Sequence, residues 1–143
     1  MSSKYYGENG LGLVIPKSDD AFMTIMERVA EETGNELETD DVYELEEDEI
    51  YDSVDYLRNH VCEALYYGED EVTSVTPAFK ERGEYLENED IIVFWADKTP
   101  DAFIAVYTEE SIVEEFRKKV GKYLPDNFDY LAHIGYFSCT VYS

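Results

Sequence analysis

The side chains in this sequence whose type and spacing indicate a chemical role are the carboxylates. Residues 27–71 contain 18 Asp and Glu against two bases, Arg28 and Arg58, a net charge of −16. An ordered array of carboxylates at near-phosphate spacing can occupy a basic surface that is built for nucleic acid. The candidate partner-binding residues are therefore the most concentrated acids: Glu44, Glu46, Glu47, Asp48, Glu49, Asp52, Asp55, Glu63, Glu69 and Asp70.

Other kinds of chemistry have weak support in the sequence. The two histidines are far apart, and the two cysteines, Cys62 and Cys139, are not at zinc spacing. No segment has the Asp-x-Asp-x-Asp-Gly pattern of a calcium loop. Two Cys–His pairs, at 60/62 and 133/139, could be imagined as nucleophile and base, but nothing orients either pair. We therefore expect no catalytic residue, no metal site and no cofactor, so the chain is predicted not to be an enzyme.

The composition excludes several classes of protein. The 143 residues carry a net charge of −23, yet 44% of them are hydrophobic and 15% aromatic. A disordered acidic tail would have few aromatics, so the chain is expected to fold, as one acidic domain over residues 1–143. A surface this negative repels phosphate, which argues against direct binding to nucleic acid or to an anionic membrane.

The first residues, the apolar runs and the cysteines together indicate the cellular compartment. Residues 1–6 lack the apolar core of a secretory signal. The longest apolar run, residues 91–96, is far short of the ~20 residues that span a bilayer. Two cysteines without a signal peptide are typical of free thiols in a reducing compartment. We expect a cytoplasmic protein.

Two helices have clear start and stop signals. Apolar residues recur at helical spacing over residues 19–33, between a capping Ser18 and a terminating Gly34. The second of these helices lies between Thr108 and Gly121, with acids in its first turn and lysines in its last, as the helix dipole favours.

A longer helix is predicted over residues 47–67. Its apolar stripe steps by three or four residues through Ile50, Val54, Leu57, Val61 and Leu65. A second row lies opposite that stripe and should face solvent: Asp48, Asp52, Asp55, Asn59 and Glu63. Like charges one turn apart each destabilise a helix by about 0.2–0.5 kcal/mol. With only Arg58 to relieve this repulsion, something other than folding stability favours the pattern.

Apolar runs between the helices predict the strands. They fall at 11–15, 42–45, 72–76, 91–96, 102–107 and 132–142, with a glycine turn over 7–10 before the first. The runs 91–96 and 102–107 flank a turn cluster and should form a hairpin at the centre of the sheet. The order of elements predicts an α+β fold, with an antiparallel-rich sheet of about four to five strands and three helices packed mainly on one face.

In charge and size the chain resembles the DNA-mimic inhibitors carried by phages and mobile elements. That resemblance implies a non-enzymatic inhibitor, of the anti-restriction or anti-CRISPR type, that binds a basic nucleic-acid-binding protein through its acids. Seven of the thirteen tyrosines lie in or near the acid-rich half, and Tyr is enriched at interfaces. Two alternatives stay open: an immunity protein that neutralises a basic nuclease toxin, and a housekeeping domain whose acidity only aids solubility.

Overall fold

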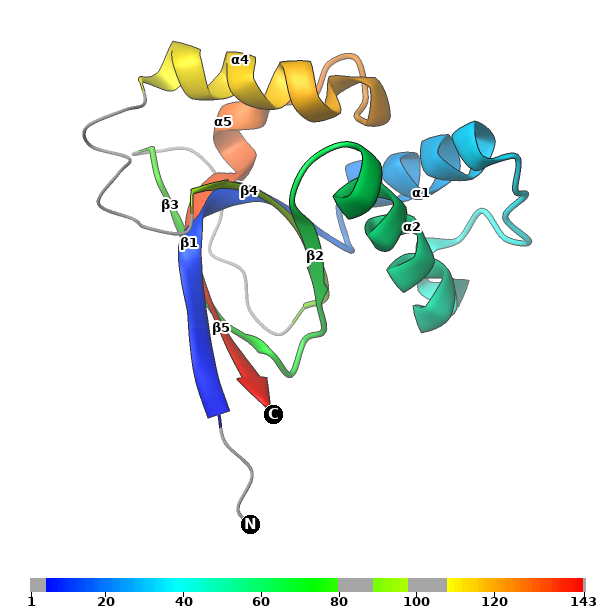
Figure 1. The fold of residues 1–143 in the computed structure, drawn as a ribbon, viewed down its shortest axis with the longest axis horizontal. Helices are drawn as coiled ribbons and strands as arrows, with labels where there is room; N and C mark the ends of the chain where they lie inside the picture. The colour runs from blue at the N-terminus through cyan, green and yellow to red at the C-terminus, as the bar shows by residue number, and fades with distance from the viewer. Residues whose placement is uncertain (1–4, 80–88, 98–107, 143) are drawn as a thin grey trace.

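The protein has an α+β fold in a computed structural model that describes residues 5–79, 89–97 and 108–142 (Figure 1). Its strands are β1 (Tyr5–Pro16), β2 (Ala64–Tyr67), β3 (Val72–Pro77), β4 (Ile91–Asp97) and β5 (Ile134–Tyr142), which form one antiparallel sheet in the order β2-β4-β1-β5-β3. The helices are α1 (Asp20–Thr33), α2 (Glu47–His60), α4 (Glu109–Val120) and α5 (Tyr130–His133), with 3-10 turns η1 (Val42–Glu44) and η2 (Gly121–Tyr123). The predicted fold class is confirmed.

The sheet separates two apolar clusters because side chains alternate along its strands. On one face, Leu11, Leu13 and Ile15 of β1 pack with the buried residues of all four helices. On the other face, Val14 belongs to a cluster of strand residues with Trp95 and others. The described helices therefore cover a single face of the sheet, with α1 and α2 side by side at one end (Figure 1). None of the described helices is both long and apolar enough to cross a membrane.

Two paired glycines allow the strands to approach closely where the sheet bends. Gly12 of β1 lies opposite Gly135 of β5, and the β1–β4 register shifts between Leu11 and Gly12. A Cβ on Gly12 would lie 2.7 Å from the carbonyl oxygen of Phe94. A Cβ on Gly135 would lie 2.8 Å from a backbone oxygen of the neighbouring strand β3. Both positions require glycine because backbone, rather than a flexible side chain, fills the space.

The predicted boundaries of α1 and α4 are close to those observed. Asp19, rather than Ser18, caps α1 by accepting a hydrogen bond from Ala21 N at 2.9 Å. Gly34 ends α1 with a φ of 76°, a conformation that glycine adopts at little cost. Thr108 caps α4 as predicted, with Ser111 completing a reciprocal capping box.

The prediction of one helix over 47–67 is wrong in its second half. Helix α2 ends at His60, and residues 64–67 form β2, an edge strand paired with β4. The amide of Trp95 on β4 donates to the carbonyl of Glu63 at 3.0 Å, which starts the pairing. Residues 64–67 supply hydrogen-bond partners for the backbone along the second edge of β4. The stability gained from this pairing outweighs the helical spacing of Leu65.

Other predicted elements need smaller corrections. Residues 42–45 are not a strand: Val42–Glu44 form η1, which Asp41 caps by accepting from Tyr43 N at 3.0 Å. The predicted turn over 7–10 is part of β1, because its backbone pairs with β5. The last strand begins at Ile134, after the short helix α5. The predicted strand 102–107 lies outside the described residues, and the neighbours of β4 are β1 and β2.

An Asp–His contact joins the start of α1 to α5. His133 Nε2 lies 2.5 Å from Asp19 Oδ2, and its Nδ1 lies 2.8 Å from the Asp129 carbonyl oxygen. Burial of the ring opposes its charged form, but hydrogen bonds to Asp19 and Asp129 outweigh that effect and raise the pKa of His133 above 6.5. The hydrogen bond from His133, against the opposing effect of burial, lowers the pKa of Asp19 below 3.8.

This contact predicts a pH-dependent contribution to stability. Ionised Asp19 stabilises the fold above its unfolded pKa, and this contribution is lost as pH falls through the lowered value. Charged His133 stabilises the fold fully below pH 6.5, and this contribution is lost as pH rises through the raised value. The difference in unfolding free energy between the wild type and His133→Gln should therefore be largest between about pH 4 and 6.5. Urea unfolding across this range measures it, and a difference that does not change with pH would contradict the assignment.

Candidate functional site

Most of the predicted binding residues lie on η1 and α2. We call seven of them the acidic face: Glu44, Glu46, Glu47, Asp48, Glu49, Asp52 and Asp55. Ile50, Val54 and Leu57 lie on the opposite side of α2 and are buried against the sheet. The predicted phase of the helix is therefore right over residues 47–60, and the acidic face points outward except at half-buried Glu49 and Asp55.

The N-terminus of α2 explains why some of these acids stabilise the helix. Glu46 and Glu49 form a reciprocal capping box, in which the Glu46 amide donates to Glu49 Oε1 at 3.3 Å. Glu47 and Asp48 also lie in the first turn, where the positive end of the helix dipole favours carboxylates by about 0.3–1 kcal/mol each. Repulsion within this turn is thus partly offset, so folding stability favours the acids of the first turn.

Asp52 and Asp55 lie beyond the first turn and need another explanation. Asp55 forms an ion pair with Arg58, three residues along the same helix, and half of its side chain is exposed. Among the residues that the structure describes, no basic side chain is within ion-pair distance of Asp48 or Asp52. An exposed pair such as Asp55–Arg58 contributes at most about 1 kcal/mol of attraction. The repulsion among the other carboxylates of α2 is therefore largely uncompensated.

Three of the predicted binding residues lie outside the acidic face. Glu63 precedes β2, whereas Glu69 and Asp70 lie in the turn between β2 and β3. The Glu69 amide donates to Asp90 Oδ1 at 2.8 Å, which fixes that turn next to β4. The expectation that Glu63 continues the row of Asp48, Asp52 and Asp55 is therefore wrong, because the helix ends at His60 before reaching it.

Beside the acidic face lies a group of residues that we call the tyrosine cluster: Tyr43, Lys17, Asp90, Tyr66 and Tyr51. Asp90 accepts from the Tyr66 hydroxyl at 2.7 Å and pairs with Lys17 at 3.5 Å. Tyr51 packs edge-on against Tyr66 with ring centroids 5.0 Å apart, and Lys17 Nζ lies 5.9 Å from the centre of the Tyr43 ring. Tyr43 is 65% exposed and Tyr51 is 40% exposed.

The sequence placed Tyr43, Tyr51 and Tyr66 among the tyrosines of the acid-rich half, but it did not predict that they gather with Lys17 and Asp90. Tyr51 follows buried Ile50 and therefore falls outside the apolar stripe of α2, on its exposed side. Burial, together with the charges of Glu71, Glu47 and Asp90, raises the pKa of the Tyr51 hydroxyl. The three carboxylates come from separate parts of the chain, so the acidic surface continues past α2 to the edge of the sheet.

Glu32 holds the helices around the site in place. Its carboxylate accepts hydrogen bonds from Tyr56 of α2 at 2.9 Å, from Lys122 of η2 at 2.5 Å, and from the hydroxyl of Tyr123. The bonds from Lys122 and Tyr123 lower the pKa of Glu32 to about 2, so it stays ionised at neutral pH. One carboxylate of α1 is thus the common partner of α2 and η2.

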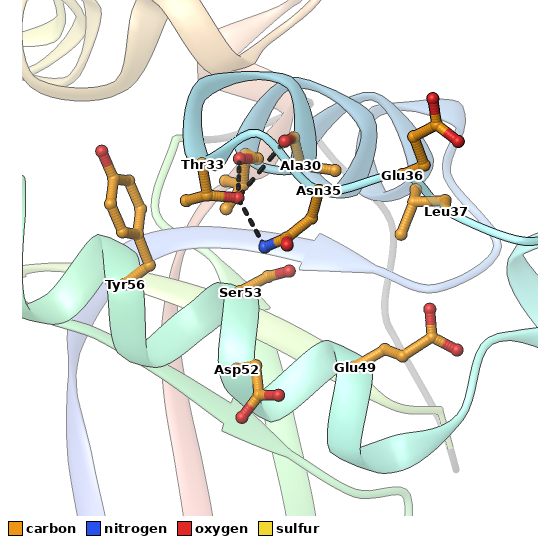
Figure 2. A pocket seen from close by; sticks show the side chains of 10 residues that line it. Ala30, Thr33, Asn35, Glu36, Leu37, Glu49, Asp52, Ser53 and Tyr56 are labelled. Atoms are coloured by element: carbon orange, nitrogen blue, oxygen red, sulfur yellow. Dashed lines mark hydrogen bonds between the residues drawn. The ribbon is translucent and has the colours of Figure 1, made fainter.

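A cleft of about 330 Å³ opens between α1 and α2. Figure 2 shows Asn35 and Ser53 facing each other across it, with Leu37 and Glu49 toward one end and Tyr56 toward the other. The side chain of Asn35 donates to Thr33 Oγ1 at 2.9 Å, so its position is fixed. Val29, Ala30 and Leu37 supply the apolar part of the lining.

A wider, strongly acidic hollow of about 740 Å³ adjoins the cleft and shares Leu37 with it. Six carboxylates line this hollow: Glu27, Glu31, Glu36, Glu38, Asp40 and Glu44. The two depressions are both lined by the segment that connects α1 to η1. Carboxylates therefore lie on several sides of the cleft.

The described residues give little support to nucleophilic or metal chemistry. Burial raises the pKa of the Cys62 thiol to about 11, so the reactive thiolate is scarce at neutral pH. His60, two residues before Cys62, packs against the Tyr56 ring with centroids 4.6 Å apart. Within residues 5–79, 89–97 and 108–142, no three His, Cys, Asp or Glu side chains are grouped so that they could hold a metal ion.

Comparisons with known proteins add no functional information: no family model, no curated protein and no solved structure matches this chain significantly.

Proposed function

We propose that this protein is a non-enzymatic inhibitor that binds a basic nucleic-acid-binding protein through the acidic face. The carboxylates would take the positions of nucleic-acid phosphates, as in an anti-restriction or anti-CRISPR protein. The observation that carries the proposal is the combination of exposed carboxylates on α2 with the exposed side chains of Tyr43 and Tyr51 beside them.

Each part of that combination supports a different aspect of binding. Asp48 and Asp52 have no basic partner among the described residues, so their field is available to steer a positively charged protein toward the face. Tyr43 and Tyr51 offer apolar area with a hydrogen-bonding tip, which is typical of interface anchors. An acidic surface that served solubility alone would have no need for exposed aromatic residues.

Competition with nucleic acid tests the proposal. Proteins that bind the immobilised chain are collected from a lysate of the organism in which it is found, and each one is purified and assayed for duplex DNA binding. We expect a captured protein whose bound DNA is displaced by this chain, with an affinity that falls steeply as salt rises. The variant Glu47→Gln/Asp48→Asn/Asp52→Asn should bind that protein about tenfold or more weakly.

A charge-matched control makes the test specific. Glu109→Gln/Glu110→Gln/Asp126→Asn removes the same charge from exposed positions on α4 and after η2. We expect the control to retain affinity within a small factor. Equal weakening of both variants would mean that net charge, rather than the acidic face, drives binding. A stable ternary complex with DNA would rule out the mimicry of nucleic acid.

A further inference from the structure

We infer that the cleft between α1 and α2 receives one arginine side chain of the basic partner. This inference rests on the proposed function, because it assigns a specific contact within the same interface. It starts from the size of the cleft. At about 330 Å³, it is at the lower limit of ligand pockets, so it suits one side chain better than a large organic ligand.

The lining of the cleft matches the two parts of an arginine. Val29, Ala30 and Leu37 provide apolar surface for the methylene stem, and Tyr56 provides an aromatic ring at one end (Figure 2). A guanidinium stacks on such a ring and donates in several directions at once, whereas an ammonium does neither as well. Ser53 and Asn35 supply the polar oxygen acceptors between the two ends.

The charge around the cleft is also complementary to a cation. Glu49 lies at the end opposite Tyr56, and Glu36 and Asp52 also line the cleft, although their carboxylates point outward from it (Figure 2). The C-terminus of α1 ends here with no basic residue in its last turn, so the negative end of its dipole adds to the same field. Glu32 accepts a hydrogen bond from Tyr56, which holds the ring in place as one wall.

Two peptides and two charge-neutral variants test this contact. A capped nona-arginine peptide and its nona-lysine counterpart are titrated calorimetrically into the protein. Ser53→Phe fills the cleft, whereas Asn59→Phe adds the same ring to an exposed position of α2 outside the cleft. We expect the arginine peptide to bind the wild type about tenfold more tightly than the lysine peptide, and Ser53→Phe to remove that preference. Asn59→Phe should keep it.

The outcomes separate this inference from the proposed function. Equal affinity for the two peptides, or an unchanged preference in Ser53→Phe, would overturn the arginine contact and leave the acidic face as the binding surface. Failure of the wild type to bind either peptide would count against the acidic face as well. If Ser53→Phe does not fold, backbone NMR of the wild type decides: an arginine peptide that shifts the amides of Asp48 and Asn59 but not those of Asn35 and Ser53 excludes the cleft.

Discussion

Ile50→Asp is expected to remove a large share of the protein's stability at room temperature. Ile50 is 1% exposed and belongs to the core between α2 and the sheet. The substitution removes an apolar side chain and leaves a carboxylate without a partner in that core, which should lower the free energy of unfolding by about 3 kcal/mol or more. A typical domain has about 5–15 kcal/mol in total, so the loss is a large share of it. Urea unfolding followed by circular dichroism measures the change.

Tyr51→Asp provides the matched control for that experiment. It adds the same charge at the next residue of α2, where the native side chain is 40% exposed. We expect it to lose about 1 kcal/mol, because the edge-on contact with Tyr66 disappears. An equal loss in the two variants would mean that negative charge on α2, rather than burial, limits stability. It would contradict the assignment of Ile50 to the buried side of α2 and Tyr51 to the exposed side.

Gly12→Ala should destabilise the protein by about 3 kcal/mol, although a single methyl group is added. The new Cβ would lie 2.7 Å from the carbonyl oxygen of Phe94 and 2.9 Å from Val93 Cγ1. Both neighbours belong to β4, whose backbone is held by β1 and β2, so the sheet must deform to make room. The midpoint of urea unfolding reports the loss.

Gly68→Ala is the control for the glycine argument. A Cβ there would meet the end of the Glu71 side chain at 3.6 Å, an ordinary contact, and no backbone atom lies closer. We expect little change or a gain of a few tenths of a kcal/mol, since alanine restricts the unfolded chain. A similar loss at the two glycines would show that flexibility, rather than close approach, makes Gly12 necessary.

Sequence patterns predicted the fold class and the bounds of α1 and α4, because local chemistry determines where these two helices begin and end. The caps at Thr108 and Gly34, and the buried side of α2, follow from short-range rules that hold whatever the rest of the chain does. The strand at residues 64–67 could not be predicted in the same way. Its side chains continue the helical stripe, and only the distant backbone of β4 makes the extended form better.

The candidate site was predictable in part for the same reason. The acids of α2 are adjacent in sequence, so their spacing placed Asp48, Asp52 and Asp55 on one side of the helix. The tyrosine cluster combines residues from 17 to 90, and the cleft combines two helices with a connecting segment. Such groupings depend on how the elements pack, which no local pattern contains.

The hydrogen bonds to Glu32 also bear on the entropy of binding. A disordered acidic tail must lose backbone and side-chain freedom when it docks, and that loss reduces its affinity. Here α2 is already fastened to α1 through Tyr56. Helix α1 is in turn tied to η2 through Lys122 and through Arg28, which donates to the Lys122 carbonyl at 2.9 Å. The backbone beneath the carboxylates is therefore ordered before any encounter. Binding need restrict little more than the rotamers of the acids, so more of the electrostatic attraction becomes affinity.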